Sequence, residues 1–109
     1  MFRTFVNSII NYFHGKVTVA LFGSRARGDS RLSSDFDVAI ILREVDDVLS
    51  IMYKMYSLKP RSLPVDIIVI SVNEIFEDEI VKKMLTPCAL MYDGLGIGHR
   101  LQEFRREQQ

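Results

Sequence analysis

Three short apolar runs, each rich in β-branched residues, constrain the fold of this chain more than any other feature. They are residues 17–22 (VTVALF), 35–42 (DFDVAIIL) and 65–72 (VDIIVISV), and each has the length and composition of a strand. The segments around them carry apolar residues at helical spacing. Strands and helices in this order predict an α/β (α+β) chain with one mixed sheet and helices packed on it.

The expected helices can be placed from apolar spacing and from their end signals. Residues 2–13 place their apolar side chains on one helical face, and Gly15 follows as a stop. Asp46 and Asp47 are expected to open a second helix that ends before Pro60. A third helix is expected with Asn73 as its N-cap, followed by a short fourth strand over residues 89–92.

The composition limits the class of protein. A chain of 109 residues suffices for one domain with one core, and its 48% hydrophobic content is unlike that of a disordered chain. The balance of 14 basic and 14 acidic residues disfavours a protein that holds nucleic acid by its phosphates. One cysteine allows no internal disulfide, and no run of eighteen apolar residues is present to span a membrane. We expect a cytoplasmic domain over residues 1–98, followed by a polar tail over residues 99–109.

Three acidic residues lie where two of the apolar runs begin. Asp35 and Asp37 are two residues apart, so both side chains project from the same face of a strand. Asp66 lies at the start of the next apolar run, and pairing of these two strands would bring all three acids to one end of the sheet. Carboxylate oxygens are the ligands that Mg²⁺ prefers. Asp35 and Asp66 also fit a structural role at a strand end, whereas Asp37 lies inside the run and has no local turn role.

A glycine and a serine follow the first apolar run directly. Gly23 and Ser24 precede a segment, residues 25–28, that is expected to form a helical turn, and such a turn presents N–H groups to an anion. Ser24 fits equally well as a simple N-cap. Asp29 occupies the lysine position of an ATPase P-loop, which excludes that motif. Three arginines nearby could hold phosphate oxygens or pair with acids; they are Arg25, Arg27 and Arg31.

Gly23-Ser24, ten further residues and Asp35-Phe36-Asp37 reproduce the signature G-S-x10-D-x-D. This pattern resembles the DNA polymerase β-like nucleotidyltransferase superfamily, and the string GSRARGDSRLSSDFDVAI is similar to its small stand-alone members, the minimal nucleotidyltransferase (MNT) domains. PVDIIVI around Asp66 is similar to the segment that carries the family's third acid. The resemblance implies a nucleotidyltransferase fold with a mixed, mostly antiparallel sheet flanked by helices. It also implies transfer of a nucleotide monophosphate, expected to be AMP from ATP, to an acceptor hydroxyl.

The resemblance further implies a role for each site residue. Asp35 and Asp37 would hold two Mg²⁺ ions around the α-phosphate, and Asp66 would bind the metal nearest the acceptor and help remove its proton. The implied metal ligands and catalytic residues are therefore the same three acids. The residues implied to bind the nucleotide are Gly23, Ser24, Arg27 and Ser34.

A protein partner is implied as well. Many MNT proteins act as antitoxins that attach AMP to a tyrosine of a helical HEPN toxin. We expect such a partner here, because few residues follow Tyr92 to form a substrate-binding domain. Two alternatives stay open: a non-catalytic antitoxin that occludes its partner, and a nucleotidyltransferase for a small molecule, which could build its pocket as a homodimer.

Overall fold

Helices and strands follow one another along the chain largely as its sequence predicts. The computed structural model of the protein describes residues 1–23 and 35–101. The elements in chain order are α1 (Phe2–Tyr12), β1 (Thr18–Phe22), β2 (Phe36–Leu42), α3 (Val48–Leu58), β3 (Val65–Ser71), α4 (Val72–Glu77), α5 (Glu79–Met84) and β4 (Ala89–Asp93). None of the helices in this part of the chain is long and apolar enough to cross a membrane.

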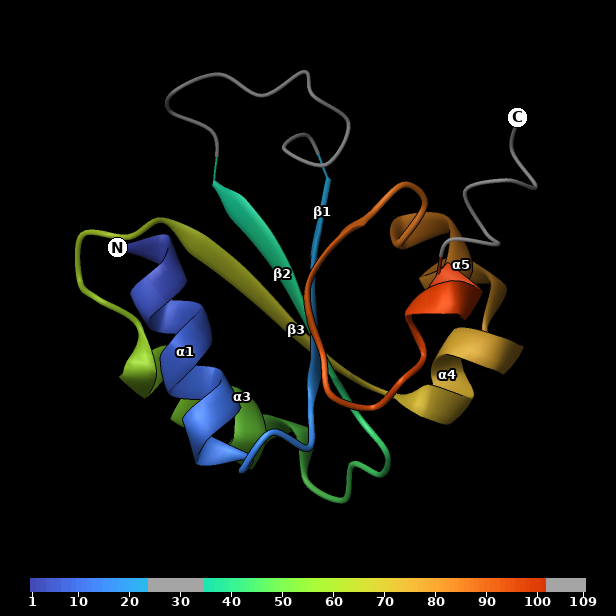
Figure 1. Ribbon diagram of the computed structural model, residues 1–109, viewed down its shortest axis with the longest axis horizontal. Helices are drawn as coiled ribbons and strands as arrows, with labels where there is room; N and C mark the ends of the chain where they lie inside the picture. The colour runs from blue at the N-terminus through green and yellow to red at the C-terminus, as the bar shows by residue number, and fades with distance from the viewer. Residues whose placement is uncertain (24–34, 102–109) are drawn as a thin grey trace.

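The four strands form one sheet in the order β3-β2-β1-β4 (Figure 1). The central strand β1 pairs antiparallel with both β2 and β4, whereas β2 and β3 run parallel. The predicted mixed, mostly antiparallel sheet is confirmed. A parallel pair needs a crossover connection, and α3 supplies it between β2 and β3.

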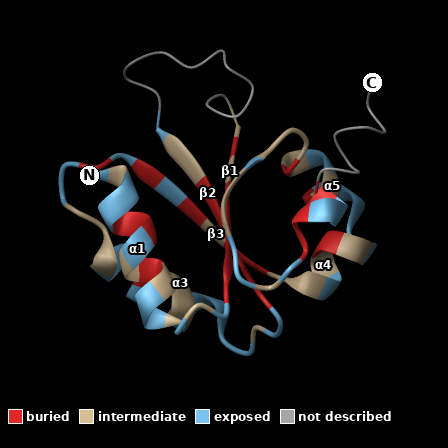
Figure 2. Ribbon diagram, viewed as in Figure 1, coloured by how far each residue is buried: buried red, intermediate tan, exposed pale blue. Residues whose placement is uncertain are grey.

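Helices cover both faces of the sheet, with α1 and α3 on one side and α4 and α5 on the other (Figure 1). Side chains along β2 alternate between two buried clusters: Val38 and Ile40 pack on the α1/α3 side, Ala39 and Ile41 on the α4/α5 side. Figure 2 shows the buried residues concentrated in the strands and on the inner faces of the helices. Burial on both faces explains why the strand sequences are almost continuously apolar.

The first helix is anchored near the start of β2. Phe5, Val6 and Ile9 are fully buried on its inner face, as the spacing predicts. The ring of Phe2 stacks on that of Phe36, with centroids 4.4 Å apart. This contact ties the beginning of α1 to the end of the sheet where the acids lie.

Polar side chains position β3, which forms one edge of the sheet. The N–H of Ile67 donates a hydrogen bond of 3.0 Å to the Tyr56 hydroxyl of α3. The Lys59 ammonium donates to the carbonyls of Pro60 and Leu63, at 3.2 and 2.9 Å, in the loop that leads into the strand. These bonds hold the start of β3, where Asp66 lies, against α3.

The expected helix after β3 differs in its cap and in its continuity. Asn73 is not the N-cap. Ser71 caps α4 instead through a reciprocal capping box with Glu74, which satisfies two backbone N–H groups. A second start follows at Asp78, whose carboxylate accepts from the N–H groups of Ile80 and Val81 and begins α5. The single helix expected from the sequence is therefore two short helices.

The chain remains packed after β4 because of Asp93. Its carboxylate accepts hydrogen bonds from the Thr18 hydroxyl at 2.9 Å and from the N–H groups of Ile97 and Gly98 at 2.9 and 2.8 Å. Thr18 is fully buried, so this bond satisfies a polar group inside the fold. Leu101 is only 2% exposed. The packed part of the described chain thus includes Leu101, and residues 102–109 lie outside the described residues.

We predict that Asp93→Asn lowers the free energy of unfolding near neutral pH, because an amide cannot accept all of these hydrogen bonds. The expected loss is only about 1 kcal/mol, since solvent screens the charge at this site. Burial alone would raise the pKa of Asp93, but the hydrogen bonds from Gly98, Ile97, Thr18 and Gly96 outweigh it and lower the pKa below 3.8. The stabilisation is therefore fully present well above the ordinary pKa of a carboxyl group and disappears as the pH falls through the lowered pKa. Urea unfolding of both proteins between about pH 6 and pH 2.5 measures this difference; a difference that is constant over the range contradicts the prediction.

Candidate active site

Strand register brings two acids side by side. The parallel pairing of β2 with β3 aligns Asp37 with Asp66, and the antiparallel pairing of β1 with β2 aligns Phe22 with Asp37. Asp37 alternates in step with Ala39 and Ile41, so it belongs to the sheet face covered by α4 and α5. The two acidic strands do pair, which is the condition under which the acids were expected to meet at one end of the sheet.

Asp35 lies at the same end of the sheet. It precedes β2 by one residue, and the N–H of Phe36 donates to the carbonyl of Pro64 at 2.9 Å, so pairing with the β3 side already begins here. Asp35 and Asp37 are two positions apart, which places both on one side of an extended chain. Asp35 and Asp66 are exposed, while Asp37 is half-buried. This end of the sheet therefore carries two exposed carboxylates and one half-buried carboxylate.

Gly23 closes the site from the side of β1. It follows the last residue of that strand with φ +73°, a conformation that favours glycine. A Cβ added here would lie 3.1 Å from Cγ and 3.3 Å from Cβ of Asp37, closer than ordinary van der Waals contact. The backbone of this turn passes directly beside the Asp37 carboxylate. The other predicted nucleotide-binding residues, Ser24, Arg27 and Ser34, lie outside the described residues, as does the helical turn expected over residues 25–28.

The donor set of this site fits Mg²⁺, because it consists of carboxylate oxygens. Asp37 and Asp66 are cross-strand neighbours, a spacing of about 5 Å between Cα atoms, so side-chain rotation suffices to direct both carboxylates at one ion. Within residues 1–23 and 35–101, no three acidic, histidine or cysteine side chains converge as a metal site. The backbone thus brings Asp35, Asp37 and Asp66 to one end of the sheet, but their carboxylates do not converge on a single metal position.

Two charged residues at the other end of the sheet line a pocket that the sequence does not predict. Lys16 and Arg43 line a pocket of about 610 Å³ there. Each lies next to an apolar run, one before β1 and one after β2, and neither belongs to a motif. Only the pairing of the strands, which brings the start of β1 beside the end of β2, could reveal them.

Comparison with solved structures places the fold. A Sulfolobus solfataricus protein, provisionally described as a nucleotidyltransferase, matches 81% of this chain and 73% of its own with a TM-score of 0.63 and 27% sequence identity. A chain from a toxin–antitoxin complex solved with AMP-PNP matches 98% of this chain and 83% of its own, with a TM-score of 0.57. At 15% identity the second likeness shows the fold alone. No curated protein sequence matches the chain.

The family model described as "Polymerase beta, Nucleotidyltransferase" matches residues 7–86. This span contains β1, β2 and β3, and with them Gly23 and all three acids. The resemblance that the G-S-x10-D-x-D spacing indicates is thereby confirmed. The chain belongs to the polymerase β nucleotidyltransferase family.

Proposed function

We propose that this protein is a Mg²⁺-dependent nucleotidyltransferase that moves AMP from ATP to a hydroxyl of a protein partner, and that it acts as an antitoxin. The observation that carries the proposal is the parallel register that sets Asp37 beside Asp66, with Asp35 at the same end of the sheet. Membership of the nucleotidyltransferase family supports the reaction class. The acceptor we propose is a tyrosine of a HEPN toxin.

The reaction exchanges one P–O bond for another, and the acceptor hydroxyl gives up its proton to Asp66. The oxygen of the acceptor hydroxyl forms a bond to the α-phosphorus of ATP, and the bond from that phosphorus to the oxygen bridging to the β-phosphate breaks. Pyrophosphate leaves with the electron pair of the broken bond. Mg²⁺ held by Asp35, Asp37 and Asp66 would neutralise the charge that develops on the phosphate oxygens.

The surroundings of each acid favour different tasks. Asp66 is exposed near the start of the edge strand β3, so an acceptor presented by a second protein can reach it. We assign Asp66 to accept the proton of the hydroxyl. Asp37 is half-buried between Phe22 and Asp66 in the strand register, and Gly23 packs against it. We assign it to hold the reacting phosphate in place through the metal.

The toxin–antitoxin complex solved with AMP-PNP supports the choice of donor and partner. Its matched chain has the same fold as this protein, and AMP-PNP is an analogue of ATP. A protein of this fold therefore occurs in such an assembly together with a bound adenine nucleotide. ATP is accordingly the donor to test first, and the partner toxin is the acceptor.

The expected result is that the toxin gains one AMP when it is mixed with this protein, ATP and Mg²⁺. Label should pass to the toxin from ATP labelled at the α-phosphate and not from ATP labelled at the γ-phosphate, because pyrophosphate leaves. Intact mass spectrometry and peptide mapping identify the modified tyrosine, whose change to Phe should abolish the adduct. A HEPN protein, if one is encoded in a gene adjacent to that of this chain, is the candidate to use.

Two controls separate the alternatives. Removal of Mg²⁺ with EDTA should stop the transfer, since the charge on the phosphates is then not neutralised. Toxin inhibition that needs neither ATP nor Mg²⁺ would instead establish occlusion of the partner. Absence of any adduct on an active toxin rejects AMP transfer to this partner.

A further inference from the structure

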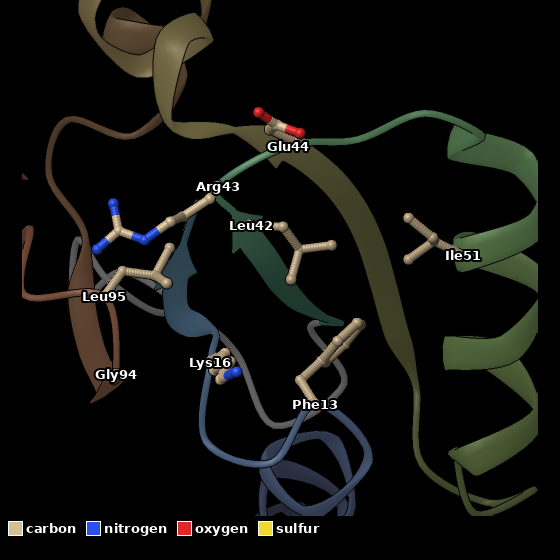
Figure 3. A pocket seen from close by; sticks show the side chains of 8 residues that line it. All are labelled: Phe13, Lys16, Leu42, Arg43, Glu44, Ile51, Gly94 and Leu95. Carbon is tan, nitrogen blue, oxygen red and sulfur yellow. The ribbon is translucent and has the colours of Figure 1, made fainter.

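A pocket of about 610 Å³ opens at the end of the sheet opposite the three acids (Figure 3). Leu42, which lines it, ends β2, whereas Asp35 and Asp37 lie at the beginning of the same strand. Seven residues of strand separate the two ends by roughly 20 Å. The pocket is therefore a separate feature from the candidate active site.

Its apolar wall comes from four different parts of the fold. Phe13 follows α1, Leu42 ends β2, Ile51 belongs to α3, and Leu95 follows β4. Leu42 is 7% exposed and the other three are half-buried, so these side chains are held by the core while still reaching the pocket. The volume lies within the range of about 300–1,000 Å³ that small-molecule sites occupy. Such a wall suits the apolar body of a small ligand.

The charged residues that line the pocket are two cations, Lys16 and Arg43, and one carboxylate, Glu44. Lys16 and Arg43 line it and are exposed, and neither forms an ion pair with a carboxylate of the described residues. Figure 3 shows Arg43 extending toward Leu95, with Glu44 on the opposite side of Arg43 from Lys16 in this view. Two cations without carboxylate partners beside an apolar wall complement a ligand with an anionic head.

We propose that this pocket binds a small amphipathic anion, in which a carboxylate or phosphate group is attached to an aliphatic or aromatic body. Lys16 and Arg43 attract the anionic group, and Phe13, Leu42, Ile51 and Leu95 contact the body. A charged head and an apolar body are both needed, because the two cations outnumber the Glu44 carboxylate on the polar side and the rest of the wall is apolar. The site does not depend on the proposed nucleotide transfer, since it shares no residue with the acids.

The test uses the full chain labelled with ¹⁵N and three probes that share one alkyl body: octanoate, octyl phosphate and 1-octanol. The two anions should cause saturable amide shifts centred on Lys16, Arg43 and Leu95, and neutral octanol should bind at least about tenfold more weakly. All probes are kept below the concentration at which they form micelles. A preference for octanoate identifies a carboxylate ligand, and a preference for octyl phosphate identifies a phosphate monoester.

The variants test the charges directly. Lys16→Gln combined with Arg43→Gln should weaken binding of the anions at least about tenfold and leave that of octanol unchanged. A matched control, Arg61→Gln with Lys83→Gln, removes the same two charges at exposed positions outside the pocket and should not alter binding. The amide spectrum of each variant reports whether it is folded. Absence of saturable shifts at the pocket, or equal binding of octanol and the anions, overturns the proposal.

Discussion

Replacing Asp37 by Asn should lower the rate of nucleotide transfer by on the order of 10²–10³-fold or more, the loss typical when a preorganised electrostatic group is removed from an active site. Asp37 is the half-buried member of the three acids, aligned with Asp66 across the sheet and packed against Gly23. An amide keeps nearly the same volume but carries no charge, so it binds Mg²⁺ poorly and cannot hold the phosphate through it.

The fold should survive this change, because Asn has nearly the same shape as Asp and can still form hydrogen bonds at this half-buried position. Urea unfolding and the transfer assay on the same preparations separate stability from activity. Asp46→Asn is the matched control: it removes an exposed carboxylate after β2, away from the site, and should leave transfer unchanged.

A readout that does not depend on activity comes from metal binding. Added Mg²⁺ should raise the melting temperature of the wild type and of Asp46→Asn, since a ligand that binds only the folded state stabilises it. The same addition should have little effect on Asp37→Asn. Full transfer activity in Asp37→Asn, or an equal rise in melting temperature in all three proteins, contradicts the assignment.

Gly23→Ala should also reduce transfer strongly, by about tenfold or more, because it displaces the Asp37 carboxylate from its position. Gly23 has φ +73°, and an added Cβ would lie 3.1 Å from Cγ of Asp37. A methyl group there must push either the carboxylate or the turn that follows β1. A displacement of about 1 Å in a catalytic group can cost on the order of 10²-fold in rate.

Gly96 provides the matched control for backbone strain. It has φ +72°, almost the same as Gly23, but an added Cβ would meet nothing within 4 Å. The left-handed conformation alone should destabilise both variants by a similar amount, about 1–2 kcal/mol, and Gly23→Ala adds the cost of moving Asp37 or the turn. Only Gly23→Ala should lose activity beyond what its stability explains. Equal activity of the two variants would show that the contact with Asp37 does not matter for transfer.

Local sequence patterns were enough to identify most elements. Spacing of apolar residues predicted α1, because an amphipathic helix must bury one face. Asp47 was expected at the start of α3, and its side chain accepts from the N–H of Ser50 as an N-cap does. The same local reasoning failed after β3, where both Ser71 and Asn73 can cap a helix. Glu74 decides in favour of Ser71, because only that spacing completes a capping box.

The sequence indicates which residues are candidates for the site, but it does not give their relative positions in the sheet. Asp35, Asp37 and Asp66 stand out in the sequence because carboxylates at the start of apolar strands are costly to bury and therefore indicate a binding or capping role. Their meeting depends on β2 and β3 being parallel neighbours with Asp37 opposite Asp66. A shift of one residue would turn Asp66 to the other face of the sheet. Nothing within either strand specifies this register, since contacts between elements distant in sequence set it.

The sequence alone determined the order of helices and strands, the family signature and the identity of the acids, because hydrophobic period and short motifs act over a few residues. Tertiary structure alone decided the parallel register, the closeness of Gly23 to Asp37, the capping of the last turn by Asp93 and the pocket at Lys16 and Arg43. Each of these joins residues from separate elements. Their positions follow from how the two faces of the sheet are packed, which depends on the whole chain.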